Sequence, residues 1–488
     1  MSHEQKILRA SRPLACMAAI SMALPVPGAL AQDDCTPQRL AGPDGTSRSA
    51  GRTLVINDRH VLIGDSGAHS LCPGGGDPFG CTAGAVYAFQ RDLDGWRMIQ
   101  MIVPPDIRIL DGFGSQVVLD PLDPDRVVIA SGARVVGEKR GYGLVYEYDG
   151  HAWQEVERFD PPDVGRTMTT TFAASMAIHG NTMLVTQVPF VYHYKRVGGS
   201  WVHQRTLEPP AEVGEGSSFG VTGFLIDDTW AFIGAHRDRS LSTDPANPIL
   251  HGSLLVYRHH PDGSLEYAQR MLPPFDPGEL PPGGWFGYGV VFDGRTLIVG
   301  APATNGAFEA QGVAYIYELE GEQWTLRQEL RSSIPGRRHF FGGNIQLQGD
   351  TLIIGHNTWD SAPIRSHLFR RGPDGLWHET DILRPGSAAM STARGFGSAA
   401  AMHGRWAIFG APDENPGGAA YIFDLDCILG TYPCPVDLDG DGQLTIFDYL
   451  AFQTAFGTGD MAADFDGDGE LTIFDFLAFQ TAFAEGCE

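Results

Sequence analysis

Positive charge is scarce in this sequence. The 488 residues include 34 Lys and Arg against 59 Asp and Glu, which gives a formal net charge of -25 at pH 7. A chain with this charge repels nucleic acid and anionic lipid surfaces, and it carries no basic stripe to overcome that repulsion. We therefore expect no nucleic-acid partner, and we expect cations and neutral polymers as partners instead.

Charged residues of either sign make up only 19% of the chain, which argues against long solvent-exposed helices. Glycine is frequent with 62 residues and proline with 33, a balance that favours short strands joined by tight turns. The hydrophobic fraction of 43% is too high for a disordered chain. The composition predicts a folded, mainly β protein.

The sequence has no apolar run long enough to span a bilayer. A positively charged start over residues 6–12 precedes an apolar run from Leu14 to Leu24, and Ala29-Leu30-Ala31 then fits a small-residue cleavage site. We interpret residues 1–31 as a signal peptide, with Gln32 as the mature start. This predicts a secreted or cell-surface protein without membrane insertion after cleavage.

Cysteine is also sparse. Seven occur in the chain, and six remain after the signal peptide, an even number that suits disulfides in an oxidising compartment. Sequence alone allows many connectivities. The positions favour the pairs Cys72 with Cys81, Cys35 with Cys427, and Cys434 with Cys487.

Catalytic motifs are missing or are better explained by structure. The 16 histidines show no His-Glu-x-x-His spacing, so a zinc enzyme is not supported. Residues 64–67 and 216–220 resemble serine-hydrolase motifs, but both fall at strand ends of the repeat described next. No pair of carboxylates for sugar hydrolysis stands out. We therefore assign no catalytic residue and favour a non-enzymatic role.

A unit of about 55 residues recurs along the chain, which is typical of propellers and solenoids. Each copy has a Phe-Gly strand, an aliphatic strand that ends in Gly-Ala, a Tyr-rich strand and a Trp strand.

The Phe-Gly element occurs at Phe113-Gly114, Phe219-Gly220, Phe286-Gly287, Phe341-Gly342 and Phe396-Gly397, with Phe172-Ala173 as a weakened copy and Ala50-Gly51 in the opening repeat. The Gly-Ala element occurs at Gly64-Asp65, Gly132-Ala133, Gly234-Ala235, Gly300-Ala301, Gly355-His356 and Gly410-Ala411, with Thr186 in the third repeat. The fourth strand carries Trp96, Trp153, Trp201, Trp324 and Trp377, with Tyr267 once in its place. We interpret the glycine of Gly-Ala as allowing a tight exit from a buried strand.

Four antiparallel strands per repeat make a blade, and seven repeat starts predict a seven-bladed β-propeller over residues 32–427. The seventh repeat lacks its Trp strand. Gln38-Arg39-Leu40 resembles Gln328-Glu329-Leu330, so we expect residues 38–40 to supply the missing strand. A disulfide between Cys35 and Cys427 would then staple the closure.

These elements resemble the FG-GAP repeats of integrin alpha-subunit heads and their bacterial relatives, over roughly residues 35–427. In that family, calcium often occupies an Asp-rich hairpin between the first two strands. The corresponding hairpins here, such as residues 179–181 and 292–294, are too short and ligand-poor. Asp120, Asp123 and Asp125 are the nearest match, and we interpret them as an acidic turn. We assign no calcium to the propeller.

The loops after Gly-Ala and the connections between blades share one face of the predicted propeller. We call this the long-loop face. Three loops there, Ser66–Thr82, Arg237–His251 and Pro302–Gln311, exceed what a blade requires and are candidate ligand contacts, with neutral insertion as the alternative. Trp285 and Trp359 are candidates for sugar stacking, with core or rim packing as the alternative.

The C-terminal region contains a duplicated acidic loop. Residues 437–456 and 464–483 match at all but three positions. Calcium needs six to eight oxygen ligands, and alternating carboxylates on a tightly wound loop supply them. The predicted ligands of the first ion are Asp437, Asp439, Asp441, Gln443 and Asp448, and those of the second are Asp464, Asp466, Asp468, Glu470 and Asp475. Thr445 and Thr472, at loop position nine, are candidates for binding through water.

A closing Asp in place of Glu resembles dockerin repeats, and Cys434-Pro435 with Gly486-Cys487 resembles the GC-type dockerin of secreted bacterial proteins. The resemblance implies a small α-helical module over residues 428–488. Each loop would lead into a helix, and we expect the apolar faces of the two helices to pack together through Phe447, Leu450 and Phe456 and their counterparts Phe474, Leu477 and Phe483. Cellulosomal dockerins often carry hydroxyl residues at loop positions ten and eleven. Here those positions are Ile446-Phe447 and Ile473-Phe474, which indicates a different receptor or a buried role.

The sequence favours a secreted, monomeric, calcium-binding protein. Its propeller would bind a protein or glycan ligand, and its tail would attach to a cohesin-like or other surface receptor. One alternative is a polysaccharide-degrading enzyme displayed through the same tail. Another is a tail that serves only sorting or stability.

Overall fold

The fold is described from a computed structural model of the whole chain. The structure describes residues 35–43, 47, 49–69, 83–92, 95–132, 141–162, 172–276, 279, 282–356, 365–386, 393–415, 417–430, 436, 438, 445–460, 463–465 and 471–485. The statements below concern these residues.

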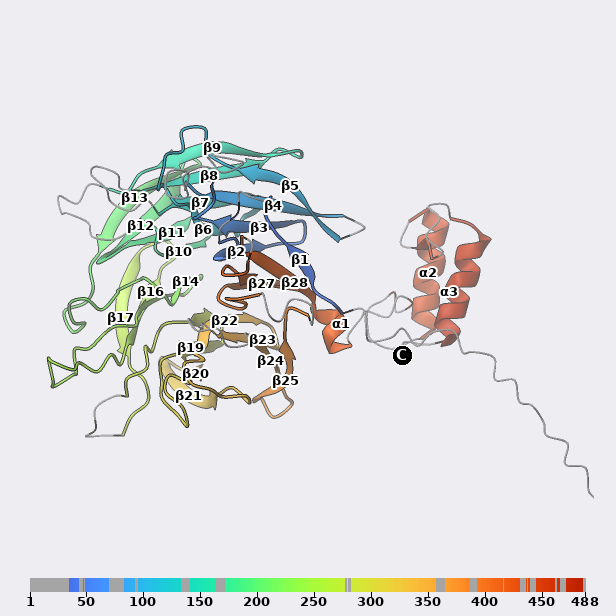
Figure 1. Cartoon of the computed structure of the whole chain (residues 1–488). Coiled ribbons are helices and arrows are strands. Elements are labelled where there is room, and N and C mark those ends of the chain that lie inside the picture. The colour runs from blue at the N-terminus through green and yellow to red at the C-terminus, as the bar shows by residue number, and fades with distance from the viewer. Residues whose placement is uncertain are drawn as a thin grey trace, which may run out of the picture.

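Seven four-stranded antiparallel sheets form the blades of a propeller, which confirms the predicted fold (Figure 1). Blades one to four are β2 Thr53–Ile56, β3 His60–Asp65, β4 Ala85–Asp92, β5 Gly95–Ile102; β6 Phe113–Asp120, β7 Asp123–Ser131, β8 Tyr142–Tyr148, β9 Trp153–Phe159; β10 Met176–His179, β11 Thr182–Gln187, β12 Phe190–Val197, β13 Ser200–Leu207; and β14 Phe224–Ile226, β15 Trp230–Ala235, β16 Ser253–His259, β17 Leu265–Met271. Blades five to seven are β18 Val290–Phe292, β19 Thr296–Ala301, β20 Val313–Glu320, β21 Gln323–Leu330; β22 Phe341–Gln348, β23 Thr351–His356, β24 Ser366–Arg371, β25 Trp377–Leu383; and β26 Ala400–His403, β27 Trp406–Ala411, β28 Ala419–Asp424 with β1 Gln38–Leu40.

The Phe of each Phe-Gly element is a wedge between blades. Phe286 forms an isolated parallel bridge with Gly252 of the preceding blade, and Phe341 does the same with Gly312. The Phe side chains are fully buried at Phe113, Phe172, Phe219, Phe286, Phe341 and Phe396. In most blades the first strand begins a few residues after this element, whereas β6 and β22 begin at the Phe itself.

The glycine of the Gly-Ala element has a different role from the predicted one. Gly300 and Gly410 do not adopt positive φ. A Cβ on Gly300 would lie 1.9 Å from the carbonyl oxygen of Gly342 in the next blade, and one on Gly410 would lie 1.8 Å from that of Gly51. Glycine is therefore required by the close approach of two blades, and not by a tight exit.

Two repeats vary this contact. In blade three, the hydroxyl of Thr186 donates a hydrogen bond at 2.7 Å to the carbonyl oxygen of Gly220, the glycine that follows the next Phe. In blade two, Ala130 occupies the position that glycine has in the Gly-Ala element of other blades. The strand register shows this, because Ala130 pairs with Gly143 as Gly300 pairs with Ala314. The assignment to Gly132-Ala133 was therefore wrong by two residues.

The Trp strand also needs one correction. Leu265 pairs with His259 in blade four, in the same register in which Trp324 pairs with Leu319 in blade five. Leu265 is buried, whereas Tyr267 is exposed. Leu265 therefore replaces Trp in this blade, since an aliphatic side chain fills the same buried position.

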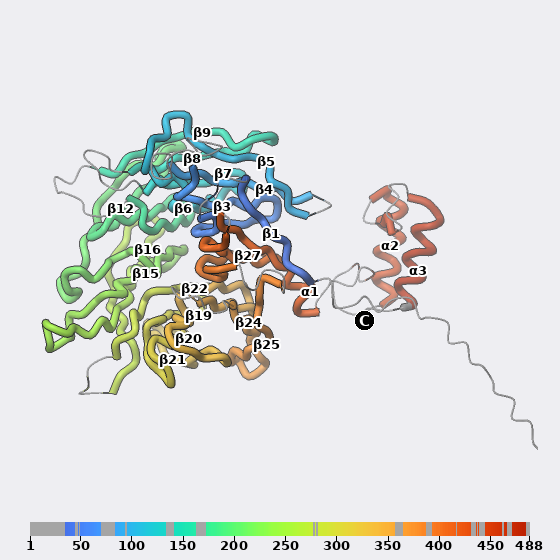
Figure 2. Tube along the Cα trace, in the orientation of Figure 1, coloured from blue at the N-terminus to red at the C-terminus, as the bar shows by residue number. Residues whose placement is uncertain are grey.

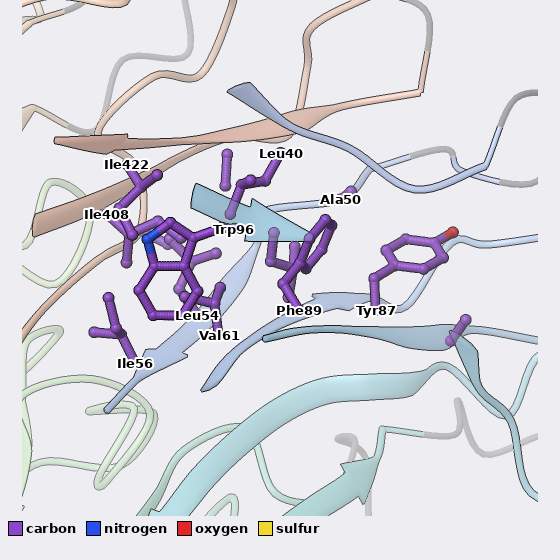
Figure 3. Close-up of a cluster of buried hydrophobic side chains, with 14 of the residues drawn as sticks. Leu40, Ala50, Leu54, Ile56, Val61, Tyr87, Phe89, Trp96, Ile408 and Ile422 are labelled. Carbon is purple, nitrogen blue, oxygen red and sulfur yellow. The ribbon is translucent and has the colours of Figure 1, made fainter. Parts of the chain in front are cut away.

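The ring closes as predicted. β1 pairs with β28, and Figure 2 shows this N-terminal strand beside the last blade. A disulfide joins Cys35 to Cys427, which confirms the predicted pair. Leu40 packs in one core with Trp96 of blade one and Ile422 of blade seven (Figure 3). The pairs Cys72 with Cys81 and Cys434 with Cys487 lie outside the described residues.

Three helices follow the propeller strands: α1 Leu425–Leu429, α2 Ile446–Thr458 and α3 Ile473–Glu485. α2 and α3 lie side by side (Figure 1), and the rings of Phe452 and Phe479 stack at 4.1 Å between them. The buried cluster between these two helices draws only on residues 436–483. In the part of the chain that the structure describes, no helix has the length and apolarity needed to cross a membrane.

Candidate functional site

The two helices α2 and α3 begin with the same arrangement of a carboxylate and a threonine. The backbone N–H of Thr445 donates to Asp448 at 2.7 Å, and the backbone N–H of Thr472 donates to Asp475 at 2.6 Å. Each threonine hydroxyl in turn accepts a backbone N–H of its helix at 3.1 Å, which caps the helix end. Loop position nine therefore acts as a helix cap, and position twelve accepts the backbone N–H of the cap residue.

Both carboxylates are buried. The exposed fraction of Asp448 and of Asp475 is 0%. Residues 428–488 contain no Lys, Arg or His, although both loops are rich in Asp. Burying a carboxylate is costly unless a partner compensates its charge. No side chain of this segment can supply that positive charge.

An oxygen-rich and base-free donor set fits calcium, which binds carboxylate and carbonyl oxygens. The structure describes Asp448, Asp464 and Asp475 among the predicted ligands. The others lie outside the described residues: Asp437, Asp439, Asp441, Gln443, Asp466, Asp468 and Glu470. Within the described ranges alone, no group of three His, Cys, Asp or Glu could hold a metal ion.

The outer surface of the helix pair differs from the prediction. Phe456 and Phe483 pack between the helices, with Tyr449 and Phe476. Four residues expected there are exposed instead: Phe447, Leu450, Phe474 and Leu477. Phe452 and Phe479 take the central place, because they face the partner helix while position eleven of each loop points away from it.

Loop positions ten and eleven are therefore on the surface. Ile446 is 63% exposed and Phe447 is 64% exposed, and Ile473 and Phe474 match them at 62% and 63%. Leu450 and Leu477 are exposed as well, and we call these six apolar side chains of the two helices the tail surface. Large exposed apolar patches mark interaction sites. A buried role for these positions is contradicted.

On the propeller, the acidic turn of blade two is held by arginines. Asp120 pairs with Arg126 at 3.8 Å and with Arg196, and Asp125 pairs with Arg59 at 2.6 Å. The arginines already compensate the charges of Asp120 and Asp125.

The serine-hydrolase-like motifs have structural roles. Asp65 is buried and accepts hydrogen bonds from Ser47 at 2.9 Å and from the backbone of Ser49 at 3.0 Å. Ser217 is also buried, and Ser218 has φ +59° in the turn that leads to Phe219. Neither motif has the strand-to-helix turn of a nucleophile elbow.

Blade six contains a polar cluster that the motif search missed. His356 and His367 approach through their Nε2 atoms at 2.8 Å, and His367 Nδ1 lies 3.1 Å from Glu379. The hydroxyl of Ser332 lies 3.2 Å from His367 Nε2. His356, His367 and Glu379 lie on β23, β24 and β25, and Ser332 follows β21, so no motif local in sequence joins them. A search for His at the Tyr position of the repeat would have found His367.

The cluster resembles a Ser-His-Glu triad in distance alone. His367 is fully buried and His356 contacts its Nε2, so the ring cannot serve an exposed nucleophile. Burial lowers the pKa of His356 to about 3. In blade three, Gln187 and Tyr192 occupy the same two strand positions and bond at 3.1 Å. The histidine pair is the blade-six version of this buried polar contact.

Comparisons with known proteins add little. No protein-family model and no curated protein matches the chain. Among solved structures, the chain is similar to the periplasmic gluconolactonase PpgL of Pseudomonas aeruginosa, with 14% sequence identity and a TM-score of 0.44. The match covers 71% of this chain and 87% of that chain. We draw no argument about activity from a likeness of this degree.

Proposed function

We propose that this is a secreted calcium-binding protein in which an FG-GAP-like propeller binds a ligand and a dockerin-like tail, residues 428–488, attaches it to a cell-surface or extracellular complex. The observation that carries the proposal is the burial of Asp448 and Asp475 in a segment without any basic side chain. Two calcium ions, one per loop, would compensate these charges and order the loops.

The tail surface supports attachment to a protein receptor. Six apolar side chains at equivalent positions of two helices face solvent, where they cost hydration free energy unless a partner covers them. The residues at loop positions ten and eleven are apolar. The receptor that fits would therefore take the place of a cohesin and would present an apolar binding surface.

Export is supported by the disulfide. Cys35 and Cys427 are bonded, and disulfides persist in oxidising compartments. The N-terminal pattern of a charged start, an apolar run and a small-residue cleavage site points the same way.

A pull-down from an envelope extract of the producing cells tests the attachment. Full-length protein should retain a partner with calcium and lose it with a chelator. The variant Asp448→Asn/Asp475→Asn should lose the partner in both conditions. Asp58→Asn/Asp228→Asn, which changes two exposed carboxylates on propeller hairpins, should behave as the unmodified protein. Retention that is indifferent to chelation would contradict calcium-dependent attachment.

A further inference from the structure

A pocket of about 570 Å³ opens on the long-loop face of blade four. Its lining includes Arg237, Arg239, Asn247 and Leu250, all from the connection between β15 and β16. The volume lies in the range of small-ligand sites. One of the long loops singled out from the sequence thus builds a cavity.

The loop is held in one conformation by a buried carboxylate. Asp238 is 0% exposed and accepts hydrogen bonds at 2.6 Å from Ser253 and at 2.6 Å from Arg270. It also accepts the backbone N–H of Ser240 at 3.0 Å. The bond to Ser240 fixes the backbone after residue 238, and the backbone N–H of Arg237 donates to the carbonyl oxygen of Ser217 at 3.0 Å before it. The neighbouring side chains are therefore positioned in advance of any ligand.

Arg237 and Arg239 flank this residue and are both exposed. The charge of Asp238 is compensated by Arg270. Among the residues that the structure describes, neither Arg237 nor Arg239 has a carboxylate within ion-pair distance. Two guanidinium groups therefore border the pocket with their charge available. Guanidinium groups bind carboxylates through paired, charge-assisted hydrogen bonds.

The backbone of Trp285 meets this loop, but the Trp285 ring packs among neighbouring aromatic rings and is not part of the pocket lining. The carbonyl oxygen of Leu250 accepts the backbone N–H of Trp285 at 3.3 Å. The Trp285 ring stacks on Phe340 at 5.8 Å and contacts His236, the residue before Arg237, at 6.1 Å. Burial lowers the pKa of His236 to about 4, so this ring is neutral at pH 7.

Trp285 is held in an unfavourable backbone conformation. Its φ is +60°, at the position before the Phe wedge. Blades two and seven have Gly112 and Gly395 at this position, with φ of +62° and +77°. Ser218 and Phe340 have φ of +59° and +52° at the same position before blades four and six, so this conformation belongs to the repeat.

We propose that this pocket binds a short acidic oligosaccharide, with a uronate carboxylate on Arg237 and Arg239, a hydroxyl on Asn247 and the apolar sugar face toward Leu250. This names the ligand class of the propeller and rests on the proposed function. The net charge of -25 disfavours long polyanions, so the ligand is a short chain held by local contacts.

Calorimetry on the full-length protein with trigalacturonate and with uncharged galactotriose tests the proposal. Trigalacturonate should bind at least ten times more tightly than galactotriose. Arg237→Gln/Arg239→Gln should weaken trigalacturonate binding by about tenfold or more, because it removes charge-assisted hydrogen bonds. The control Arg97→Gln/Arg295→Gln removes two exposed arginines from strands near the opposite face and should leave binding unchanged.

Asn247→Ala provides an independent variant. Asn247 lines the pocket and is exposed in the loop, so the protein should fold while affinity for trigalacturonate falls. Equal binding of the charged and neutral sugars, equal loss in the control variant, or equally tight binding of inorganic sulfate would overturn the proposal. Calcium-dependent retention of the receptor should be unchanged in every pocket variant. Unmodified protein that binds its receptor but no trigalacturonate would therefore refute the ligand class without refuting attachment.

Discussion

Gln38 in β1 clamps the backbone of Trp96 in β5. The side-chain amide of Gln38 donates to the Trp96 carbonyl oxygen at 2.8 Å and accepts its N–H at 2.9 Å. Gln328 makes the same pair of bonds to Trp377, at 2.9 Å each. The N-terminal strand β1 is therefore the outer strand of the last blade, and its hydrogen bonds to Trp96 fasten that blade to the first.

The closure should depend on the disulfide. Cys35→Ser/Cys427→Ser removes a cross-link between residues 392 apart in sequence, which frees the unfolded chain. We expect the free energy of unfolding to fall by about 2–5 kcal/mol, measured by denaturant titration. Gln38→Ala, which leaves the cross-link, should cost about 1 kcal/mol. Equal stability of the serine variant and the unmodified protein would contradict a stapled closure.

The packing of blade seven against blade one should not tolerate a methyl group at Gly410. The Cβ of Gly410→Ala would collide with the backbone of Gly51, where nothing flexible can move aside. We expect a loss of about 1–3 kcal/mol in stability, measured by thermal unfolding. The control Gly457→Ala in α2 meets no atom within 4 Å and should not destabilise the protein. A Gly410→Ala variant with unchanged Tm would refute the explanation.

Stability should fall in mild acid. Burial is the largest cause that lowers the pKa of His193 and of His236 to about 4. In the unfolded chain these rings bind a proton near pH 6.5, so the unfolded state binds more protons as the pH falls. Each should cost up to about 1.4 kcal/mol per pH unit between pH 6.5 and 4.

Chemical unfolding at several pH values, in the presence of a chelator, measures this dependence. His236→Asn should flatten the slope over that interval, while the exposed control His403→Asn should leave it unchanged. A slope that is the same in all three proteins would show that the buried histidines do not set the acid sensitivity.

The tail surface should be separable from folding. Phe447→Ser/Phe474→Ser changes two exposed side chains, so the stability should stay within about 0.5 kcal/mol of the unmodified protein. Capture of the receptor should fall by at least tenfold, because central apolar anchors carry most of an interface's binding energy. Phe452→Ser, inside the helix pair, should instead unfold the tail. Undiminished capture by Phe447→Ser/Phe474→Ser would place the receptor elsewhere.

The repeat made the propeller predictable, because hydrophobic periodicity and recurring Phe, Gly and Trp positions are local in sequence. The closing strand could be found since Gln38 and Leu40 repeat the pattern of Gln328 and Leu330. The reason for glycine at Gly300 and Gly410 could not be found, because the atoms that exclude a Cβ belong to the next blade.

The same limit applies to the candidate sites. Two apolar residues at adjacent loop positions, such as Ile446 and Phe447, read equally well as core or surface until the partner helix is placed. The pocket at Arg237 depends on which way alternate residues of a long loop point, and that is fixed by the buried bonds of Asp238. The calcium loops stay a prediction from spacing, because their proposed ligands are close together in sequence.

The most direct test is a calcium titration of the full-length protein by calorimetry. We expect two ions per chain for the unmodified protein and no tight binding for Asp441→Ala/Asp468→Ala, with the unfolding transition of the propeller unchanged. Undiminished calcium uptake by this variant, or no uptake by the unmodified protein, would contradict two calcium-filled loops in the tail.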